Sequence, residues 1–287
     1  MLLIAGPCVI EDEGLTLEIA AELKRQLQDL PVDFYFKASF DKANRSSIEG
    51  FRGPGLTGGL RTLTKVRSTL DLKVLTDVHE THQVVPVAEV VDFLQIPAFL
   101  CRQTDLILET ARAALRMNRR LNIKKGQFLA PWDTKNIIQK VGDVVVKEKA
   151  LPPKDWFCLT ERGVSFGYNT LVVDMTTFQT IHGFGVPVVF DATHSVQAPG
   201  AGPGGMSTGG KRENIEVLAR AAIASGADGI FMECHPNPAI AKSDGPNAFY
   251  LDKIKPFIEQ LLQIRATVSS LPKLLPEALL TEKRQGN

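Results

Sequence analysis

The sequence predicts an α/β protein in which eight parallel strands close into a single-domain (β/α)8 barrel. Short apolar runs recur along the chain, and segments with helical periodicity separate most of them. Strands that alternate with helices pair in parallel, and eight such units suffice to close a barrel. The length of 287 residues also fits a barrel of about 250 residues. A doubly wound open sheet is the alternative, because a strand count read from sequence carries an error.

The expected strands are the apolar runs near residues 2–5, 34–38, 74–77, 93–96, 122–124, 156–160, 188–191 and 229–233. The expected helices between them cover residues 16–30, 58–69, 80–90, 106–116, 134–140, 177–182 and 214–225. In the first helix, the apolar residues from Leu17 to Leu27 keep a spacing of three and four, which a helix packed on a sheet requires. In the last one, the small side chains of residues 219–224 permit a close approach to a strand.

Three stretches read as irregular. Residues 51–59 and 198–211 are glycine-rich, which predicts mobile loops over a site rather than regular structure. Residues 142–154 also read as longer or more irregular than a barrel connection needs. The barrel is expected to occupy residues 1–270, and residues 271–287 are expected to form a frayed C-terminal tail.

The bulk composition is that of a soluble globular enzyme, with 23% charged and 44% hydrophobic residues. A net charge of +1 is not the excess of positive charge that binding to nucleic acid or to an anionic membrane would require. The apolar N-terminus lacks the basic region of a signal peptide, and no stretch approaches the roughly 20 apolar residues of a membrane span. Four widely spaced cysteines without a CxxC pair are expected to be reduced thiols. A cytoplasmic protein without nucleic-acid or membrane partners is therefore expected.

The stretch from Lys37 to Ser47, KASFDKANRSS, follows an apolar run and gathers two lysines, an arginine and three serines. Lysine supplies a point charge and arginine a bidentate fork, and both suit the oxygens of phosphate or carboxylate. A basic loop taken alone is more often a solvated surface loop. The interpretation as an anion site gains support because the rest of the chain repeats the design.

Polar side chains follow every predicted strand. In order they are GPCVIE, KASFDKANRSS, TDVHE, PAFLCRQ, KKGQ, ERG, DATHS and ECHP. In a barrel all of these positions converge on the C-terminal face, where barrel enzymes build their active sites. Eight such coincidences are hard to reconcile with a purely structural protein, so the pattern predicts an enzyme.

Cys8, His194 and Glu233 end the first, seventh and eighth strands, which are neighbours when a barrel closes. Asp244, eleven residues beyond Glu233, can fold back to join them. Taken alone, Cys8 is more often a small buried hydrophobe than a ligand. Together, a thiolate, an imidazole and two carboxylates make a four-ligand divalent metal site. This mixed donor set does not select among Zn²⁺, Fe²⁺ and Mn²⁺.

Four cations, Lys37, Lys42, Lys124 and Arg162, arise from the ends of the second, fifth and sixth strands. Most lysines merely solvate a surface, but four cations around one barrel mouth repel each other unless anions bind there. The pattern therefore favours a highly charged anionic substrate.

The remaining histidines carry weaker signals. His79 ends the third strand and is a secondary site candidate. His82 and His182 fall within expected helices and are assigned to structure, whereas the assignment of His235 stays open.

The motifs together resemble one enzyme family. GPCVIE, KASFDKANRSS, TDVHE, PAFLCRQTD, KKGQF, TERG, FDATHSVQ and ECHP are similar to those of the 3-deoxy-D-manno-octulosonate 8-phosphate synthases, also named 2-dehydro-3-deoxyphosphooctonate aldolases. The match covers residues 2–265, and KANRSS is its most specific piece. The related 3-deoxy-D-arabino-heptulosonate 7-phosphate synthases share the barrel but carry a Lys-Pro-Arg-Thr-like motif at that point.

The resemblance implies a condensation of phosphoenolpyruvate with D-arabinose 5-phosphate and water in lipopolysaccharide biosynthesis. Carried over by motif, the phosphoenolpyruvate site is Lys37, Ser39, Lys42, Ala98, Phe99, Lys124, Gln127 and Arg162. The arabinose 5-phosphate site is Asn44, Arg45 and Ser46, the last two at its phosphate. The implied catalytic group is His194, Asp244, Lys42 and Asn44.

The family divides into metal-dependent and metal-independent forms, and the latter carry asparagine where this chain has Cys8. The resemblance thus implies the metal-dependent form, with one divalent Zn, Fe or Mn ion per subunit on Cys8, His194, Glu233 and Asp244, and a homo-tetramer. One alternative is a related synthase that uses another aldehyde, such as erythrose 4-phosphate or an N-acetyl amino sugar. Another is a non-catalytic phosphosugar-binding barrel, against which the complete ligand set argues.

Overall fold

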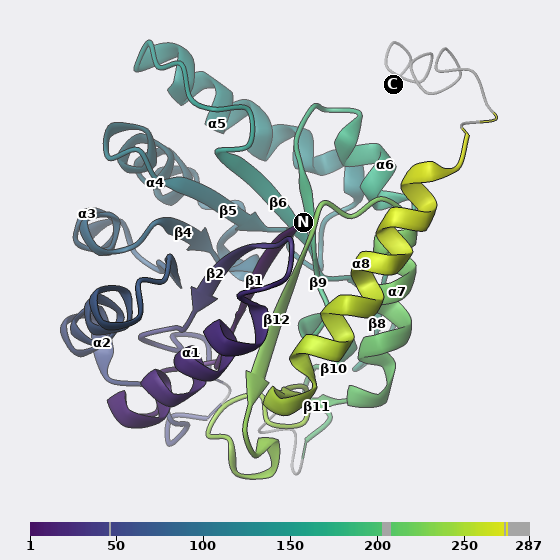
Figure 1. Cartoon of the computed structure of the whole chain (residues 1–287). Helices are drawn as coiled ribbons and strands as arrows, with labels where there is room; N and C mark the ends of the chain where they lie inside the picture. Colours follow the sequence, from purple (N-terminus) through teal and green to yellow (C-terminus); the bar gives the residue numbers. More distant parts are fainter. Residues whose placement is uncertain (46, 203–207, 273, 275–287) are drawn as a thin grey trace.

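A computed structural model describes residues 1–45, 47–202, 208–272 and 274. Within these residues, eight parallel strands form a closed barrel in the order β1, β2, β3, β4, β5, β6, β9 and β12 (Figure 1). The first and last strands pair in parallel, from Leu2 opposite Gly229 to Gly6 opposite Glu233. This pairing closes the sheet on itself, so the predicted (β/α)8 barrel is confirmed and the open sheet is excluded.

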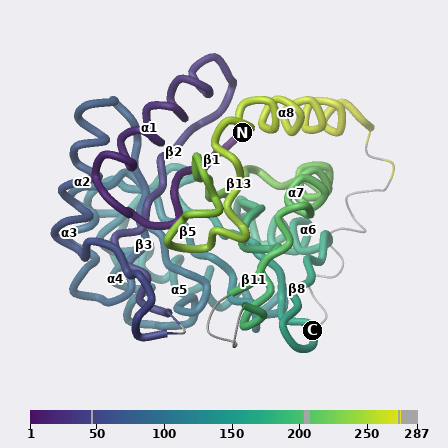
Figure 2. The backbone as a smooth tube through the Cα atoms, turned by 90° about the horizontal axis from the view of Figure 1, so that it is seen from below, coloured from purple at the N-terminus to yellow at the C-terminus, as the bar shows by residue number. Residues whose placement is uncertain are grey.

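The barrel strands are β1 (Leu2–Gly6), β2 (Asp33–Lys37), β3 (Val74–Asp77), β4 (Phe93–Ile96), β5 (Arg120–Lys124), β6 (Phe157–Glu161), β9 (Val188–Asp191) and β12 (Gly229–His235). The helices are α1 (Glu13–Leu27), α2 (Gly55–Leu70), α3 (Thr81–Val90), α4 (Thr104–Arg116), α5 (Lys135–Lys147), α6 (Thr177–His182), α7 (Ile215–Ala224) and α8 (Ile254–Ser270). Figure 2 shows these helices arranged around the strands. All eight expected strands and seven expected helices are present, with ends that differ by a few residues, and α8 is an addition.

Short elements decorate the C-terminal ends of the strands. Two antiparallel hairpins, β7 (Val164–Ser165) with β8 (Leu171–Val172) and β10 (Gln197–Ala198) with β11 (Gly209–Gly210), follow β6 and β9. Strand β13 (Phe249–Tyr250) pairs in parallel with the end of β12.

Two of the three stretches interpreted as irregular are partly helical. Helix α2 begins at Gly55, so residues 55–59 are helical and only residues 51–54 form a loop. Helix α5 continues to Lys147, so residues 142–147 are helical as well. The glycines misled the prediction because in α2 they serve packing: a Cβ on Gly59 would lie 2.2 Å from Cβ of Phe40.

The third stretch and the predicted C-terminal tail fall partly outside the described residues. In the stretch 198–211, the hairpin β10–β11 is regular, and residues 203–207 lie outside the described ranges. Of the predicted tail 271–287, residues 273 and 275–287 also lie outside them.

Two apolar layers hold the barrel together. Outward strand residues such as Leu3, Ala5 and Phe36 pack against the helices in the larger cluster. The inner cluster fills the barrel below its mouth and consists of Ile4, Tyr35, Leu75, Phe93, Cys158, Val189 and Phe231, with Leu2 packed against it. The barrel is therefore a packed core rather than a pore. Within the described ranges, no helix combines the length and the apolar composition that crossing a membrane would take.

Candidate active site

The side chains of the candidate site reach the barrel mouth because strand residues alternate in direction. Side chains two residues apart point to the same face of a strand. The inner apolar layer is thus followed, two positions later, by an inward polar side chain. The pairs are Tyr35 and Lys37, Leu75 and Asp77, Phe93 and Gln95, Val189 and Asp191, and Phe231 and Glu233.

A cavity of about 660 Å³ opens over these polar side chains at the C-terminal ends of the strands. Its size is that of a site for a small molecule. The sequence-predicted residues that line it are Lys37, Ser39, Lys42, Asn44, Arg45, Ala98, Phe99, Lys124, Gln127, Arg162, His194, Glu233 and Asp244. The structure therefore gathers residues from six strand ends and from the loop after β12 around one space.

Three of the four predicted metal ligands, Cys8, Glu233 and Asp244, form one cluster, and His194 lies next to its two carboxylates. Ligand atoms of Cys8, Glu233 and Asp244 all lie within 4.8 Å of one another. The Nε2 atom of His194 lies 3.6 Å from Oε2 of Glu233 and 3.7 Å from Oδ2 of Asp244. One sulfur, one nitrogen and two carboxylate groups make a donor set that fits a divalent transition metal.

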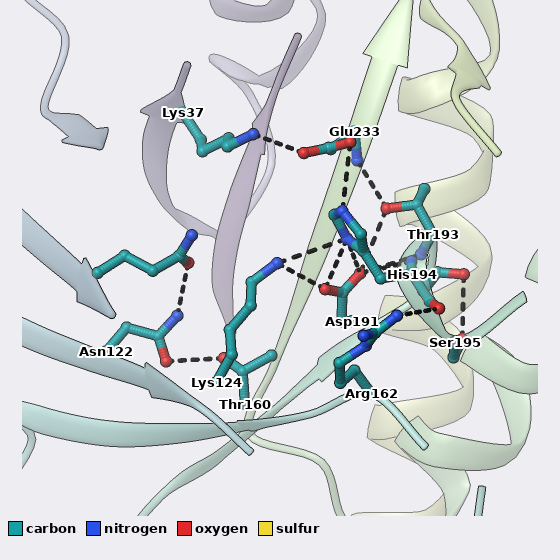
Figure 3. A network of polar contacts seen from close by, with 12 residues as sticks. Lys37, Asn122, Lys124, Thr160, Arg162, Asp191, Thr193, His194, Ser195 and Glu233 are labelled. Carbon is teal, nitrogen blue, oxygen red and sulfur yellow. Dashed lines mark hydrogen bonds and ion pairs between the residues drawn. The ribbon is translucent and has the colours of Figure 1, made fainter. Parts of the chain in front are cut away.

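The imidazole of His194 is oriented by Asp191 at the end of β9 (Figure 3). Nδ1 of His194 lies 2.8 Å from Oδ2 of Asp191, which leaves Nε2 facing Glu233 and Asp244. Carboxylates commonly fix metal-binding histidines in this manner. The same Asp191 oxygen lies 2.7 Å from Nζ of Lys124. Asp191 therefore joins the metal cluster to a cation of the anion site.

Nearby positive charges favour the ionised form of the two carboxylates of the cluster, Glu233 and Asp244. Burial favours the neutral form of Glu233, but Lys37, His194 and Lys42 outweigh it and lower the pKa of Glu233 to about 2. The pKa of Asp244 is also low despite burial, because His194, Lys42 and Cys8 favour its charged form. In contrast, burial and the nearby Glu233 raise the pKa of the Cys8 thiol well above its usual range. A bound cation would reverse this for the thiol, since a coordinating thiol is deprotonated.

The four cations at the barrel mouth repel each other less than the sequence pattern suggested. Nζ of Lys37 lies 2.5 Å from Glu233, and Lys124 pairs with Asp191. Lys42 donates to Oγ of Ser39 at 2.9 Å and lies 3.9 Å from Glu233. The argument from unbalanced positive charge is therefore weaker than the sequence pattern indicated, because two of the four cations have close carboxylate partners.

Arg162 is the cation of this set whose side-chain partners are all neutral among the described residues. Its guanidinium is 4% exposed and donates to Oε1 of Gln127, to the carbonyl of His194 and to Oε1 of Gln197. Burial lowers the pKa of Arg162, although arginine stays protonated in proteins. A buried guanidinium held by neutral acceptors keeps its charge available for an anionic ligand.

Lys125 and Glu161, the neighbours in sequence of Lys124 and Arg162, point away from the barrel interior. Lys125 and Glu161 are fully buried outside the inner layer, and their charged atoms lie 3.2 Å apart. This ion pair ties the ends of β5 and β6 together outside the inner layer. Strand alternation thus separates a structural pair from a pair that faces the cavity.

Two of the three predicted sugar-phosphate residues, Asn44 and Arg45, line the cavity. Arg45 donates from Nε to the carbonyl of Phe51 at 2.9 Å. Ser46, predicted to bind the sugar phosphate, lies outside the described residues. Ala98 begins a short turn after β4, and the ring of Phe99 is 52% exposed at the rim.

Comparison with known proteins decides the family. The DAHP synthetase I family model matches residues 1–270. The chain belongs to the DAHP synthetase I family. Proteins named 2-dehydro-3-deoxyphosphooctonate aldolase are among its relatives, and the resemblance stated from the motifs is confirmed. Those of Methylibium petroleiphilum and Paraburkholderia phymatum are 54% and 53% identical to it over 272 residues, which are 95% of this chain and 93% of each relative. That of Cyanothece sp. is 51% identical over 267 residues, which are 93% of each chain.

The histidines outside the metal cluster divide in this DAHP synthetase I family member much as predicted. His79 lines the cavity, and its Nε2 lies 2.8 Å from Oδ2 of Asp77. His182 pairs with Asp228 at 2.7 Å, away from the cavity lining. His82 lies 3.2 Å from Glu80 and is exposed. The open case, His235, lies 3.5 Å from Glu11 and not in the metal cluster.

Two buried carboxylates at the site of this family member, Asp77 and Asp191, had no role assigned from sequence. Asp77 accepts from Oγ of Ser39 at 2.5 Å, and Asp191 bridges Lys124 and His194. Burial opposes both charges, but the adjacent histidines and lysines hold the pKa of each well below its usual range. The sequence did contain a signal for them, because each is the last residue of a barrel strand, in the motifs TDVHE and DATHS. Lys37 and Lys124 also stand at the last position of a strand.

Proposed function

We propose that this chain is a metal-dependent 3-deoxy-D-manno-octulosonate 8-phosphate synthase of lipopolysaccharide biosynthesis. It joins phosphoenolpyruvate to D-arabinose 5-phosphate and water, and it releases the eight-carbon keto sugar phosphate and inorganic phosphate. The observation that carries the proposal is that His194, Glu233 and Asp244 line one cavity with the buried cation Arg162, and that Cys8 lies against Glu233 and Asp244. The names of the relatives support the same reaction.

The reaction forms one carbon–carbon bond and one carbon–oxygen bond, and it breaks another carbon–oxygen bond. C3 of the enol phosphate joins the aldehyde carbon of the sugar, and the oxygen of water adds to C2. The bond between C2 and the phosphate oxygen then breaks, so phosphate leaves with that oxygen. The protein must hold two anionic substrates in contact and keep other water away from them.

We assign phosphoenolpyruvate to the inner part of the cavity. Lys124 and Arg162 are 5% and 4% exposed, so their charges act in a site shielded from solvent. Lys37, Ser39, Lys42, Ala98, Phe99 and Gln127 complete this proposed site. Preorganised cations of this kind stabilise the negative charge that develops on a departing phosphate.

We assign arabinose 5-phosphate to the outer part of the cavity. The Asn44 and Arg45 side chains come from the loop after β2, which also supplies Lys42 to the inner part. Ser46 belongs to the same proposal on the strength of its motif. The loop after β2 would thus place the aldehyde next to the enol phosphate, and it is the segment that should decide which aldehyde is accepted.

We assign one divalent ion to Cys8, His194, Glu233 and Asp244. When bound there, Zn²⁺, Fe²⁺ or Mn²⁺ polarises a carbonyl or lowers the pKa of a water. Asp191 holds the imidazole of His194 in the orientation this requires. His194, Asp244, Lys42 and Asn44 are the groups proposed to position or move protons around the aldehyde, since they line the cavity beside the cluster.

A phosphate-release assay with different aldehydes tests the proposal. The purified protein with phosphoenolpyruvate and a divalent ion is expected to release phosphate with arabinose 5-phosphate. Erythrose 4-phosphate or an N-acetyl amino sugar should give little release, and either one as the preferred substrate would establish the related synthase instead. Thermal stabilisation by arabinose 5-phosphate without phosphate release would favour the non-catalytic barrel.

We further propose a cytoplasmic homo-tetramer. The four cysteines are free and buried, which suits a reducing compartment. Light scattering coupled to size-exclusion chromatography gives the subunit count directly, and a mass other than four subunits would remove the tetramer from the proposal.

A further inference from the structure

Gln197, the first residue of β10, contacts both halves of the candidate site. Its Oε1 accepts a hydrogen bond from Nη2 of Arg162 at 2.5 Å, and its Nε2 donates to Oδ1 of Asp244 at 3.2 Å. We propose that Gln197 is a positioning residue that fixes the Asp244 carboxylate for metal binding and connects it to Arg162. This inference rests on the proposed function, because it assigns a metal to Asp244 and an anion to Arg162.

The two oxygens of Asp244 have different surroundings. Oδ2 lies 3.4 Å from Sγ of Cys8 and 3.7 Å from Nε2 of His194, so it faces the metal cluster. Oδ1 is the oxygen that accepts from Gln197. A hydrogen bond to the oxygen outside the cluster restricts rotation of the carboxylate and leaves the other oxygen directed at the ion. Gln197 therefore does for Asp244 what Asp191 does for His194.

The backbone holds Gln197 in place for this contact. Gln197 pairs with Gly210 in the β10–β11 hairpin, and Lys211 donates to the carbonyl of Val196 at 3.0 Å. A Cβ on Gly210 would lie 1.7 Å from Oδ1 of Asn247, so only glycine allows the hairpin to approach Asn247 so closely.

The loop that carries Asp244 is fixed from its own side. The amides of Asn247 and Ala248 both donate to the carbonyl of Asp244 at 2.9 Å. Since Asn247 is also the residue that Gly210 packs against, the strand pair with Gln197 and the loop with Asp244 are in contact. A hydrogen bond orients a metal ligand when the residues that make it are themselves held in place.

The chemistry of the two partners requires an amide at position 197. The guanidinium of Arg162 only donates and the ionised Asp244 only accepts, so one side chain must accept at one end and donate at the other. Glutamine meets both needs. Methionine has nearly the same length and shape but meets neither, and asparagine keeps the amide but is one methylene shorter.

Gln127 supplies a matched control because it shares only one of the two contacts. Its Oε1 accepts from Nη1 of Arg162 at 3.0 Å. Among the contacts of the described residues, Gln127 has none with Asp244. Gln127→Met therefore disturbs Arg162 alone, whereas Gln197→Met disturbs Arg162 and Asp244 together.

Direct binding measurements on the full chain separate these effects. Co²⁺ affinity is measured by equilibrium dialysis with elemental analysis, and phosphoenolpyruvate affinity by calorimetry. Gln197→Met and Gln197→Asn should each weaken Co²⁺ binding about 10- to 100-fold, as the loss of such an orienting partner does. Gln127→Met should leave the Co²⁺ affinity unchanged, and Gln127→Met and Gln197→Met should both weaken phosphoenolpyruvate binding. The visible absorption of bound Co²⁺ should shift in the two Gln197 variants only, because it reports ligand geometry rather than stability.

Two results would overturn the inference. One is a Co²⁺ affinity within twofold of the unmodified protein in folded Gln197→Met and Gln197→Asn. The other is an equal loss of Co²⁺ affinity in Gln127→Met, which would trace the effect to Arg162. If the unmodified protein binds neither Co²⁺ nor phosphoenolpyruvate, the proposed function itself fails, and the two failures are thereby distinguished.

Discussion

At the scale of single residues, Lys124 carries the most testable assignment. It is buried, it lines the cavity, and its ammonium group lies 2.7 Å from Asp191. Burial lowers the pKa of Lys124, and the carboxylate of Asp191 opposes that effect. Asp191 thus favours the charged form of Lys124 at a place where an anionic substrate can meet it.

Lys124→Ala is expected to reduce kcat/KM for phosphoenolpyruvate by roughly 2–4 kcal/mol, the range for truncating one partner of a buried charge pair. This corresponds to about 30- to 1000-fold in rate, at 1.4 kcal/mol for each factor of ten. Steady-state phosphate release with varied phosphoenolpyruvate gives the value. Lys147→Ala, which removes an exposed lysine from the last turn of α5, should leave it unchanged. Equal kinetics in both variants would place the anion site elsewhere.

The proposed metal donors were easier to predict from the sequence than the residues that support them. Cys8, His194 and Glu233 each belong to a polar motif after a strand, and barrel closure alone brings such motifs together. Asp191 and Gln197 act through hydrogen bonds whose partners depend on side-chain rotamers and on loop packing. No one-dimensional pattern contains that information, so these roles could only be read from the structure.

At the scale of elements, the glycines of α2 and α5 look alike in sequence and differ in the structure. Gly59 faces Phe40, and a Cβ there would lie 2.2 Å from the Cβ of Phe40 and 3.0 Å from its Cα. Gly142 lies in the interior of α5, and a Cβ there would meet nothing within 4 Å. Glycine propensity therefore predicts a loop at both positions, whereas tertiary packing decides the first one.

Gly59→Ala should destabilise the fold by about 1–3 kcal/mol, the usual cost of inserting a methyl group into a packed contact. Gly142→Ala should instead stabilise it by roughly 0.5–1 kcal/mol, because alanine loses less conformational freedom in a helix. Urea unfolding followed by circular dichroism measures both free energies. A change of the same sign in the two variants would contradict this account of α2 packing.

Asp228 makes a pH-dependent connection between three elements. Its carboxylate accepts from the amide of Val188 at the start of β9 and lies 2.7 Å from Nε2 of His182 at the end of α6. Burial favours the neutral acid, but His182 and the amide of Val188 prevail and lower the pKa of Asp228. A carboxyl with a lower pKa in the folded state stabilises the fold above its unfolded pKa, near 3.9 for aspartate. That stabilisation is lost as the pH falls below this value toward the folded pKa.

Asp228→Asn should therefore lower the unfolding midpoint at pH 7 and make a smaller difference at pH 3. Thermal melts of the variant and the unmodified protein across this range measure the effect. Asp252→Asn removes a carboxylate that is 72% exposed and should shift the midpoint equally little at both pH values. A difference for Asp228→Asn that does not diminish in acid would show that the ionised form contributes nothing.

At the scale of the whole molecule, the sequence was sufficient to predict the barrel because each strand is visible as a short apolar run. Eight such runs that alternate with helices imply parallel strands that close into a barrel. The sequence did not identify the short hairpins, since strands of two residues lack periodicity. It also missed α8, although that helix has 17 residues. The hairpin β10–β11 matters nonetheless, because it carries Gln197. Local pattern thus determines the scaffold, whereas the fine geometry of the site depends on contacts between distant segments.

The proposed ion would connect four such segments: the loop after β1, the turn after β9, the end of β12 and the loop that follows it. A ligand that binds only the folded state stabilises it by about 2.7 kcal/mol at a hundred times its Kd. At about 2–4 °C per kcal/mol for a chain of this size, chelation should lower the Tm by roughly 5–10 °C. Phosphate release should stop at the same time, and added Zn²⁺, Fe²⁺ or Mn²⁺ should restore both properties.

Two buried cysteines provide the matched pair for this experiment. Cys8→Ala should have a Tm that no longer responds to the chelator, whereas Cys234→Ala, which alters a core thiol outside the cluster, should keep the response. Calorimetry with elemental analysis of the same samples measures stability and metal content together. Full activity in unmodified protein shown to be metal-free would remove the metal from the mechanism, and an equal chelator response in both variants would place the ion at another site.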